Sequence, residues 1–417
     1  MKQLILLFLG VFMIGQINAQ IVNLNPDPNG DPWIAGGVKQ FSSSEIAEMD
    51  AIPVLQLSVE SANRTLPEAV DNSTLQYWPG IKLQEGASCA QFAGIYYTFT
   101  YEINRLRGLP SNSAERRYHY KYTYNFLNGG INTGTNTING WDIVMENGCP
   151  TYEAFGGDYV SLRAWMSGYD KYYQSQQNKI KSYNQIMIND EDDIELLKHW
   201  INDHNEGSST GGLSVFYCET SGMVIEDLPP QSQNAGEGVV VEFGGGCDHA
   251  MTMVGYNDNI MYDFNNDGQF TNNVDINNDG NIDLQDWEIG AVKVANSWGD
   301  WVNEGYVYVP YCLLASQHPY GIYHGRVFMM EASAEYSPDI TYKIKVDHSS
   351  RCDLQYRVGY GINSFAENPT ETANFSSFNN QGGSYPMQGT NNDPLESSLD
   401  YSYIYTDLIL IQFKFLT

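Results

Sequence analysis

Basic residues are scarce in this sequence, which has 21 lysines and arginines against 50 aspartates and glutamates and a formal net charge of −29. Long apolar runs are scarce as well. The run IYTDLILIQFKFL near the C-terminus is interrupted by Asp407, Gln412 and Lys414, so it predicts a buried strand. A chain this acidic is a poor partner for nucleic acid or an anionic membrane. Outside the N-terminus, no unbroken apolar stretch reaches the roughly 20 residues of a membrane-spanning helix.

The N-terminus carries an apolar segment of a different kind. Lys2 precedes the short apolar run LILLFLGVFMIG, and Ala19 follows it just before Gln20. A positive start, a short apolar core and a small residue at its end are typical of a secretory signal peptide, here residues 1–19. We therefore expect a soluble exported protein, secreted or at the cell surface, that acts as a monomer.

Cysteine is limited to six residues, and none of them shows the CxxC spacing of zinc sites. Zinc is therefore not expected. Export permits disulfides, but the spacing favours no particular pairing. The six residues are Cys89, Cys149, Cys218, Cys247, Cys312 and Cys352.

A chain of 417 residues exceeds the usual size of a single hydrophobic core, so we expect more than one unit. Residues 20–65 open with the stretch NLNPDPNGDPW and predict loops. Residues 66–332 show helical patterns first and strand patterns second, which indicates an α+β domain. Residues 333–417 alternate like short strands around an Asn/Gly/Ser-rich segment, and predict a small all-β, sandwich-like module.

Two helices are predicted in the α+β domain. The first begins near Cys89 and ends before Gly108 and Pro110. Its apolar residues at helical spacing are Phe92, Ile95, Tyr96, Phe99, Ile103 and Leu106. The second covers residues 191–204, with an acidic first turn and an apolar face of Ile194, Leu197 and Ile201. Between them, the Tyr-rich residues 117–183 predict aromatic packing and surface.

Three residue types in this domain can act together chemically. At the start of a helix, the thiol of Cys89 faces unpaired N–H groups and the positive end of the helix dipole, which lower its pKa. A thiolate still needs a base and a group that orients that base. His249 heads the strand pattern HAMTMVGY, and Asn296 ends another strand pattern, two residues before Trp298. If the strands are neighbours, Asn296 can hold the imidazole toward the thiol while the indole shields their hydrogen bond from water.

Each residue also has a purely structural interpretation. A buried cysteine at a helix start is most often a small core residue. A histidine in an apolar strand is most often a satisfied core or surface residue, and an Asn-Ser pair can simply close a turn. It is the joint occurrence, in the order Cys, His, Asn, that favours the catalytic interpretation.

With these segments in view, the sequence resembles a papain-like cysteine peptidase over residues 66–330. LPEAVD resembles the start of the mature enzyme, GASCAQFA the nucleophile segment, DHAMTMVGY the histidine strand and NSWGDWVNEGYVYV the asparagine segment. The resemblance implies Cys89 as nucleophile, His249 as general base and acid, and Asn296 as the orienting residue. It also implies a helical lobe and a β-barrel-like lobe with the cleft between them, and protein or peptide substrates.

The sequence departs from the family pattern around the nucleophile. Gly86 and Ala90 stand where the family usually has a cysteine and a tryptophan. The side-chain amide of the oxyanion hole normally lies six residues before the nucleophile, where this sequence has Leu83. A one-residue deletion in the turn would bring Gln84 into that role, beside the backbone N–H of Cys89. The region before the domain is also too short for the family's long helical propeptide, so latency must work differently.

A rival interpretation is a non-catalytic surface or adhesion protein, in which the same fold serves binding. The altered surroundings of the nucleophile support it, while the presence of Cys89, His249 and Asn296 together opposes it. Acyl transfer to an amine or cleavage of a cell-wall amide are other reactions for the same three residues, but the NSWG segment favours peptide hydrolysis.

Two near-copies of D-x-N-x-D-G begin twelve residues apart, at residues 263 and 275. Alternating oxygen ligands followed by a glycine turn resemble an EF-hand or dockerin-like loop that binds Ca²⁺. The second copy is complete, whereas the first has Val274 in place of its last carboxylate. The candidate ligands are Asp263, Asn265, Asp267, Gln269, Asp275, Asn277, Asp279, Asn281, Asp283 and Asp286. A solvated Asn/Asp turn region is the alternative, and no helices flank the loops as they would in a calcium sensor.

The position of these loops suggests their role. His249 and Asn296 have 46 residues between them, more than the short loop that joins these strands in related enzymes. Residues 259–289 therefore resemble an insertion into the hairpin that carries the base and its orienting residue. We expect structural calcium there to stiffen the hairpin and to act as a switch of stability and activity.

Overall fold

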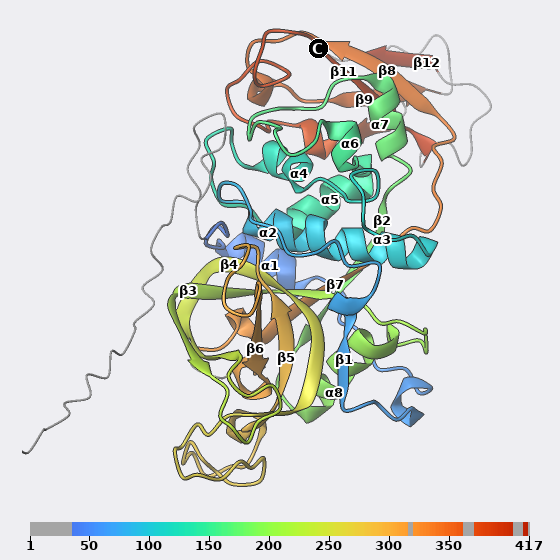
Figure 1. Ribbon diagram of the computed structural model, residues 1–417. Coiled ribbons are helices and arrows are strands. Elements are labelled where there is room, and N and C mark those ends of the chain that lie inside the picture. Colours follow the sequence, from blue (N-terminus) through green and yellow to red (C-terminus); the bar gives the residue numbers. More distant parts are fainter. Residues whose placement is uncertain (1–35, 316–319, 362–370, 403–411, 416–417) are drawn as a thin grey trace, which may run out of the picture.

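The computed structural model describes residues 36–315, 320–361, 371–402 and 412–415 (Figure 1). The predicted signal peptide, the NLNPDPNGDPW stretch and most of the C-terminal apolar run lie outside these residues. The described chain mixes helices and strands, as predicted for an α+β protein. None of its helices is long and apolar enough to cross a membrane.

Helices form the middle of the molecule in Figure 1. The α-helices are α1 (Ser43–Asp50), α2 (Cys89–Gln91), α3 (Thr100–Arg107), α4 (Tyr120–Leu127), α5 (Thr137–Asn147), α6 (Tyr152–Phe155), α7 (Tyr169–Ser175) and α8 (Glu191–Asp203). A π-helical segment, η3, covers Phe92–Phe99. Short 3₁₀ turns cover Ser61–Asn63, Asn72–Thr74, Leu284–Asp286, Tyr311–Leu314, Tyr323–Gly325, Arg351–Asp353 and Ser376–Phe378.

One long helix runs through the helical lobe. α2, η3 and α3 follow one another without a break, and Gly108, with a φ of 67°, ends the run in the left-handed conformation. The predicted helix is confirmed, although its π-helical middle was not predicted. The hydroxyl of Thr98 donates to the carbonyl of Ala93, five residues back, over 2.9 Å, which fits the wider turn.

The second predicted helix is α8, and its boundaries follow from local chemistry. The side chain of Asp190 accepts from the N–H groups of the second and third helical residues and caps the helix. Its predicted apolar face is buried as expected, with Ile194 at 2 %, and Leu197 and Ile201 at 0 % exposure. This helix packs against β4 on the outside of the β lobe.

The β lobe is a seven-stranded sheet in the order β2-β7-β3-β4-β5-β6, with β1 paired to β4. Its strands are β1 (Ala69–Asp71), β2 (Ile180–Met187), β3 (Ser214–Asp227), β4 (Gly238–Met261), β5 (Ile289–Ala295), β6 (Tyr306–Pro310) and β7 (Arg326–Ala332). β4 pairs antiparallel with β3 and β5, and also meets β6 in a parallel bridge between Val239 and Tyr308. This extra contact curls the sheet toward closure.

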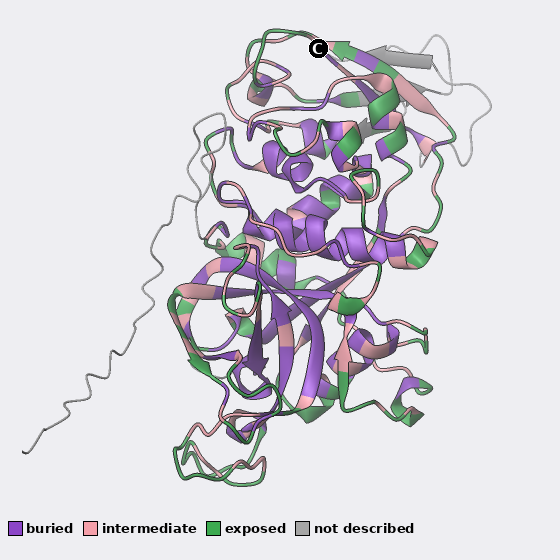
Figure 2. Ribbon diagram, viewed as in Figure 1, coloured by how far each residue is buried: buried purple, intermediate pink, exposed green. Residues whose placement is uncertain are grey.

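Residues beyond β7 form two small sheets at the far side of the helical lobe (Figure 1). β8 (Thr341–Val346) pairs with β11 (Leu395–Asp400), and β9 (Arg357–Gly361) pairs with β10 (Glu371–Asn374) and β12 (Gln412–Phe415). Their core is continuous with that of the helical lobe: Phe378 packs on Phe126 with ring centroids 5.3 Å apart. The guanidinium of Arg351 lies 4.4 Å from the ring centroid of Trp165. Burial is therefore continuous across both parts (Figure 2).

Candidate active site

The candidate nucleophile lies where the long helix meets the β lobe. Cys89 is the first residue of α2, and its side chain is fully buried. Its sulfur lies within hydrogen-bonding reach of the backbone N–H groups of Ala90 and Ala250. Ala250 belongs to β4 and directly follows His249, so the thiol lies against the strand that carries the candidate base.

His249 and Asn296 form a buried hydrogen-bonded pair, with 2.8 Å between His249 Nε2 and Asn296 Oδ1. The backbone N–H of Ser297 donates to the same Oδ1 over 2.7 Å. Since that oxygen accepts from Ser297, the partner Nε2 must be protonated and donate as well. Neutral His249 therefore carries its lone pair on Nδ1, which has no hydrogen-bond partner among the described residues. That nitrogen is free to take a proton from a thiol.

Strand pairing brings these two residues together. Thr252 of β4 pairs with Ala295 of β5, so His249 and Asn296 lie near the same end of the two neighbouring strands. The ring of Trp298 packs on His249, with centroids 4.7 Å apart and an angle of 37° between the planes. The indole therefore packs against the imidazole ring.

Gln84 lies beside the asparagine segment and is fully buried. Its backbone N–H donates to the carbonyl of Ser297 over 2.7 Å, and its Oε1 accepts from the Ser297 hydroxyl. The remaining side-chain group, Nε2, donates to the carbonyl oxygens of Gly86 at 3.0 Å and Gly36 at 3.2 Å. The amide therefore points its N–H groups at peptide carbonyls, which is the orientation that an oxyanion donor needs.

Residues 36–41, here called the N-terminal strap, cross this site. The N–H of Gly37 donates to the carbonyl of Asp248 over 2.8 Å, and the N–H of Thr135 donates to the carbonyl of Gly37, also over 2.8 Å. A Cβ built on Gly37 would lie 2.4 Å from the carbonyl carbon of Ala87. The strap is thus wedged between the turn before the nucleophile and the residue before the base.

An aromatic anchor holds the strap at its end. The ring of Phe41 lies 5.1 Å from that of Tyr217 and 5.7 Å from that of Tyr323, measured between centroids. The next residue, Ser42, caps α1 through a capping box with Glu45. The strap therefore enters a folded element directly after it leaves the cleft.

Burial controls the charge of the candidate pair. It raises the pKa of the Cys89 thiol to about 12, against weaker opposing effects of backbone N–H groups. It lowers the pKa of His249 to about 4, although the Asn296 hydrogen bond favours the protonated ring. With the strap in place, the described site therefore holds a neutral thiol and a neutral imidazole at pH 7, not an ion pair.

All six cysteines are free thiols, so the structure contains no disulfide. Five of them are buried, and Cys352 is the exception. A thiol reagent that reaches folded protein therefore has Cys352 as its main competitor to Cys89.

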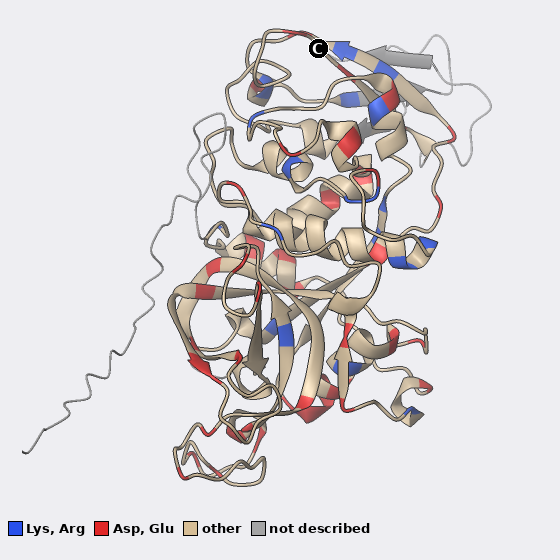
Figure 3. Ribbon diagram, viewed as in Figure 1, with Lys and Arg blue, Asp and Glu red and all other residues tan. Residues whose placement is uncertain are grey.

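The two D-x-N-x-D-G loops fold alike at the base of the β lobe, where acidic residues gather (Figure 3). The first aspartate of each loop accepts from the sixth residue: Gly268 N–H donates to Asp263 over 2.8 Å, and Gly280 N–H donates to Asp275 over 3.0 Å. The asparagine at the fourth position is left-handed in both, with a φ of 61°. The sequence repeat is therefore also a structural repeat.

A buried carboxylate closes each loop. Asp286 accepts from the N–H groups of the second and ninth residues of its own loop, each over 3.0 Å. Glu288 accepts from the second and ninth residues of the first loop, again over 3.0 Å. Glu288 thus takes the place that Val274 leaves empty, although it lies outside the twelve-residue repeat.

The predicted metal ligands lie together in this region, and they are Asp263, Asn265, Asp267, Gln269, Asp275, Asn277, Asp279, Asn281, Asp283 and Asp286. In the described part of the chain, no three His, Cys, Asp or Glu side chains gather closely enough to hold a metal alone. An ion would also need amide and carbonyl oxygens, which calcium accepts. The loops join the ends of β4 and β5 at Met261 and Ile289, the opposite end from Thr252 and Ala295. From Ala295 to Ile289, β5 advances six residues at about 3.3 Å each, so the loops begin roughly 20 Å from the end of the hairpin that carries His249 and Asn296.

Two features of the site carry little sequence signal. The strap contributes backbone groups and glycines from a loop-rich stretch, and backbone groups leave no mark in a motif. Glu288 directly precedes the strand pattern IGAVKVA and is 2 % exposed. Its position next to this buried strand was the one hint in the sequence.

No protein-family model matches this chain, and neither does any curated protein. Among solved structures, xylellain, a cysteine protease from Xylella fastidiosa, is 15 % identical with a TM-score of 0.43, covering 71 % of this chain and 96 % of its own. Procathepsin L2 from the larval midgut of Tenebrio molitor is 15 % identical with a TM-score of 0.46, covering 71 % and 78 %. ProCathepsin B S9 from Trypanosoma congolense is 15 % identical with a TM-score of 0.43, covering 72 % and 86 %. At these values the likeness decides nothing about chemistry, which rests on the side chains described above.

The neutral state of His249 predicts a pH-dependent stability. Its folded pKa of about 4 lies below the ordinary 6.5, so the unfolded chain binds more protons between these values, and stability falls as pH drops from 6.5 to 4. At about 1.4 kcal/mol per pKa unit, this residue contributes on the order of 3 kcal/mol to that fall. Urea unfolding of wild type and His249→Gln across this window measures it, because the other histidines are common to both. If the unfolding free energy of both proteins changes with pH in the same way, His249 is not buried in its neutral form.

Proposed function

We propose that this protein is an exported, monomeric cysteine endopeptidase of the papain-like type. The observation that carries the proposal is the hydrogen bond from Gln84 Nε2 to the carbonyl of Gly36, in the site where the Cys89 sulfur lies against the backbone of Ala250, the residue after His249. It supports the proposal because a peptide carbonyl already accepts from the candidate oxyanion donor. A fold that served binding alone has no need for a base with a free Nδ1 next to a thiol.

The geometry supports a covalent mechanism. The strap leaves, Cys89 gives its proton to His249 Nδ1, a peptide takes the strap's place, and the thiolate attacks its carbonyl carbon. The oxyanion that forms is held by Gln84 Nε2 and by the N–H of Cys89, which starts a helix and lacks an intrahelical acceptor. His249 protonates the leaving amine, then takes a proton from the water that hydrolyses the thioester. Asn296 keeps the ring oriented through both steps.

The strap offers a way to keep the site closed. It uses the same groups that a substrate needs, namely the Gln84 amide, the carbonyl of Asp248 and the N–H of Thr135. With the strap in place, both the thiol and the imidazole are fully buried. Release of the strap would expose the pair to water and favour its charged form.

Calcium belongs to the proposal as a structural ion. The ligand pattern of the two loops fits a hard cation, and Asp286 and Glu288 supply a buried carboxylate to each. We expect two ions per chain. Because the loops are remote from the thiol, their effect should be on stability and on the rigidity of the β4–β5 hairpin.

The peptidase proposal predicts selective labelling of one thiol. A peptidyl epoxide should modify wild type and Cys352→Ala at a single site, whereas Cys89→Ala should stay unmodified, as intact-mass spectrometry would show. Hydrolysis of an unfolded protein should follow the same pattern. If wild type and the opened variant described next neither label nor hydrolyse, the non-catalytic binding protein is the better interpretation.

Opening the cleft should increase reactivity. Gly37→Ala places a methyl group against the backbone of Ala87, so the strap must leave. Labelling of Cys89 should then become about tenfold faster or more, which corresponds to about 1.4 kcal/mol of lost strap binding. Gly245→Ala is the matched control, because a Cβ there meets nothing within 4 Å. Equal labelling rates for Gly37→Ala and wild type would refute the strap while leaving the peptidase intact.

Removal of calcium should destabilise the protein. At a calcium concentration a hundred times the Kd, each ion adds about 2.7 kcal/mol to the folded state. Chelation should therefore lower the Tm of wild type by roughly 5 °C or more. Glu288→Gln should bind one ion fewer by metal analysis, while the exposed Glu191→Gln should bind the full number. An unchanged Tm on chelation, together with no calcium in the purified protein, would contradict the site.

A further inference from the structure

The turn between the amide donor and the nucleophile is short and needs support. Gly86 adopts the left-handed conformation with a φ of 63°, and the hydroxyl of Ser88 donates to the carbonyl of Glu85 over 2.7 Å. Gln84 Nε2 donates to the carbonyl of Gly86 over 3.0 Å. The direction of the amide therefore depends on the path of this turn.

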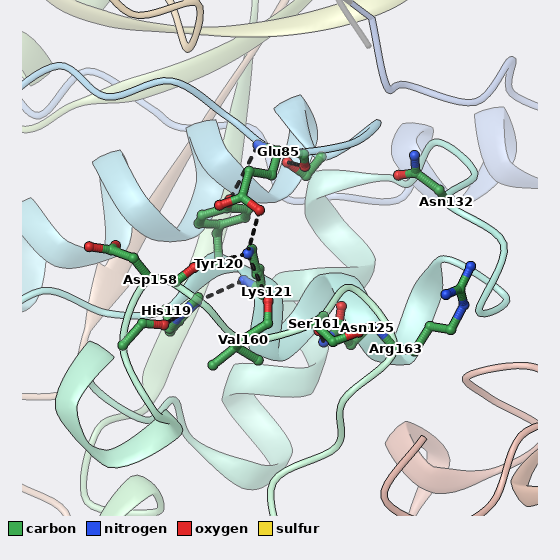
Figure 4. A network of polar contacts seen from close by, with 12 residues as sticks. Glu85, His119, Tyr120, Lys121, Asn125, Asn132, Asp158, Val160, Ser161 and Arg163 are labelled. Carbon is green, nitrogen blue, oxygen red and sulfur yellow. Dashed lines mark hydrogen bonds and ion pairs between the residues drawn. The ribbon is translucent and has the colours of Figure 1, made fainter. Parts of the chain in front are cut away.

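Helix α4 holds the turn from its outer side (Figure 4). The hydroxyl of Tyr120 accepts from the N–H of Glu85 at 3.3 Å, and the ammonium of Lys121 donates to the Glu85 carboxylate at 2.8 Å. Asn132 completes the support, because its Oδ1 accepts from the N–H of Ala87 over 2.9 Å. Glu85 and Ala87 of the turn are thus tied to the helical lobe.

Lys121 is an unusual residue for this position. Its side chain is 1 % exposed, whereas that of its partner Glu85 is 29 % exposed. The ammonium also donates to the carbonyls of Asp158 at 3.2 Å and Val160 at 2.8 Å, so all three of its N–H groups are used. A buried ammonium is costly unless it is fully paired, and here it links three separate segments.

We propose that Lys121 is a positioning residue for the oxyanion donor: by fixing Glu85, it sets the turn that aims the Gln84 amide at the reacting carbonyl. This inference rests on the proposed peptidase function. Lys121 itself touches neither the substrate nor the reacting atoms. Its effect passes from the ammonium to the Glu85 carboxylate and from there along the turn.

A comparison of two reactions at Cys89 separates positioning from general damage. Iodoacetamide alkylates the thiolate by displacing iodide from a saturated carbon, so no oxyanion forms. Peptide hydrolysis requires the oxyanion donor. A variant that has lost only the aim of Gln84 should keep the alkylation rate and lose turnover.

The experiment uses full-length protein, in the wild-type or Gly37→Ala background, whichever reacts faster. Lys121→Met should lower kcat for a peptide substrate on the order of 10- to 100-fold, with KM and the alkylation rate at Cys89 within about twofold. Gln84→Ala should lose on the order of 100-fold, the usual cost of one donor. The double variant should lose no more than Gln84→Ala alone, because the group to be positioned is already absent.

Two further variants serve as controls. Lys181→Met removes an exposed lysine whose ion pair with Glu331 spans 2.9 Å at the surface, and should leave both reactions unchanged. Glu85→Gln weakens the same contact from its more exposed end, and should show a smaller loss with the same selectivity if Lys121→Met does not fold.

Several outcomes would overturn the assignment. If Lys121→Met lowers the alkylation rate as much as kcat, Lys121 is a structural residue only. If the fold-losses in kcat of the two single variants multiply in the double variant, Lys121 acts independently of Gln84. An unchanged kcat in Lys121→Met would also refute the positioning role. If the parent protein hydrolyses nothing in either background, the peptidase proposal fails first, and that result is distinct from the others.

Discussion

The protonation of one imidazole nitrogen governs the whole candidate site. Asn296 Oδ1 accepts both from the Ser297 N–H and from His249 Nε2, so the proton of the neutral ring stays on Nε2. Nδ1 is thereby left as the base. The pairing of β4 with β5 sets this arrangement, and the next residue of β4, Ala250, presents its N–H to the sulfur of Cys89. One strand therefore supplies the candidate base and also contacts the candidate nucleophile.

Because the site depends on the pairing of β4 with β5, the loops at the other end of this strand pair can affect the site. The loops close the β4–β5 hairpin at Met261 and Ile289, and two buried carboxylates are already tied to their backbone. At roughly 20 Å along the hairpin, a bound cation exerts little direct field on the thiol through screened surroundings. Its influence must pass through the rigidity of the hairpin, so a stabilising brace fits the geometry better than a direct switch.

Local sequence patterns were sufficient for the parts of the fold that local forces determine. Apolar periodicity located the long helix after Cys89, and the acidic first turn and apolar face located α8. Contacts between distant residues were not predictable in this way. Gly36 accepts from Gln84 through a backbone carbonyl, and Glu288 closes the first loop from outside its repeat. Lys121, which holds Glu85, belongs to a Tyr-rich stretch for which the sequence predicted only packing and surface. In each case the partner is chosen by tertiary packing, and the residue alone carries no mark of it.

The strap connects steric and electrostatic control of the same thiol. A thiol at a helix start, next to two N–H groups, would ordinarily be acidified, yet burial outweighs those groups and raises the pKa of Cys89. The imidazole loses its proton for the same reason. If the strap leaves as we propose, water and substrate would reach the pair by the same route, so blocking the site and keeping the pair neutral would be one event. In the proposed mechanism, a substrate that displaced the strap would itself bury the pair, so an ion pair would have to form in the open site before the substrate closes over it. A water-filled state between strap and substrate would then be the one in which the proposed nucleophile is made.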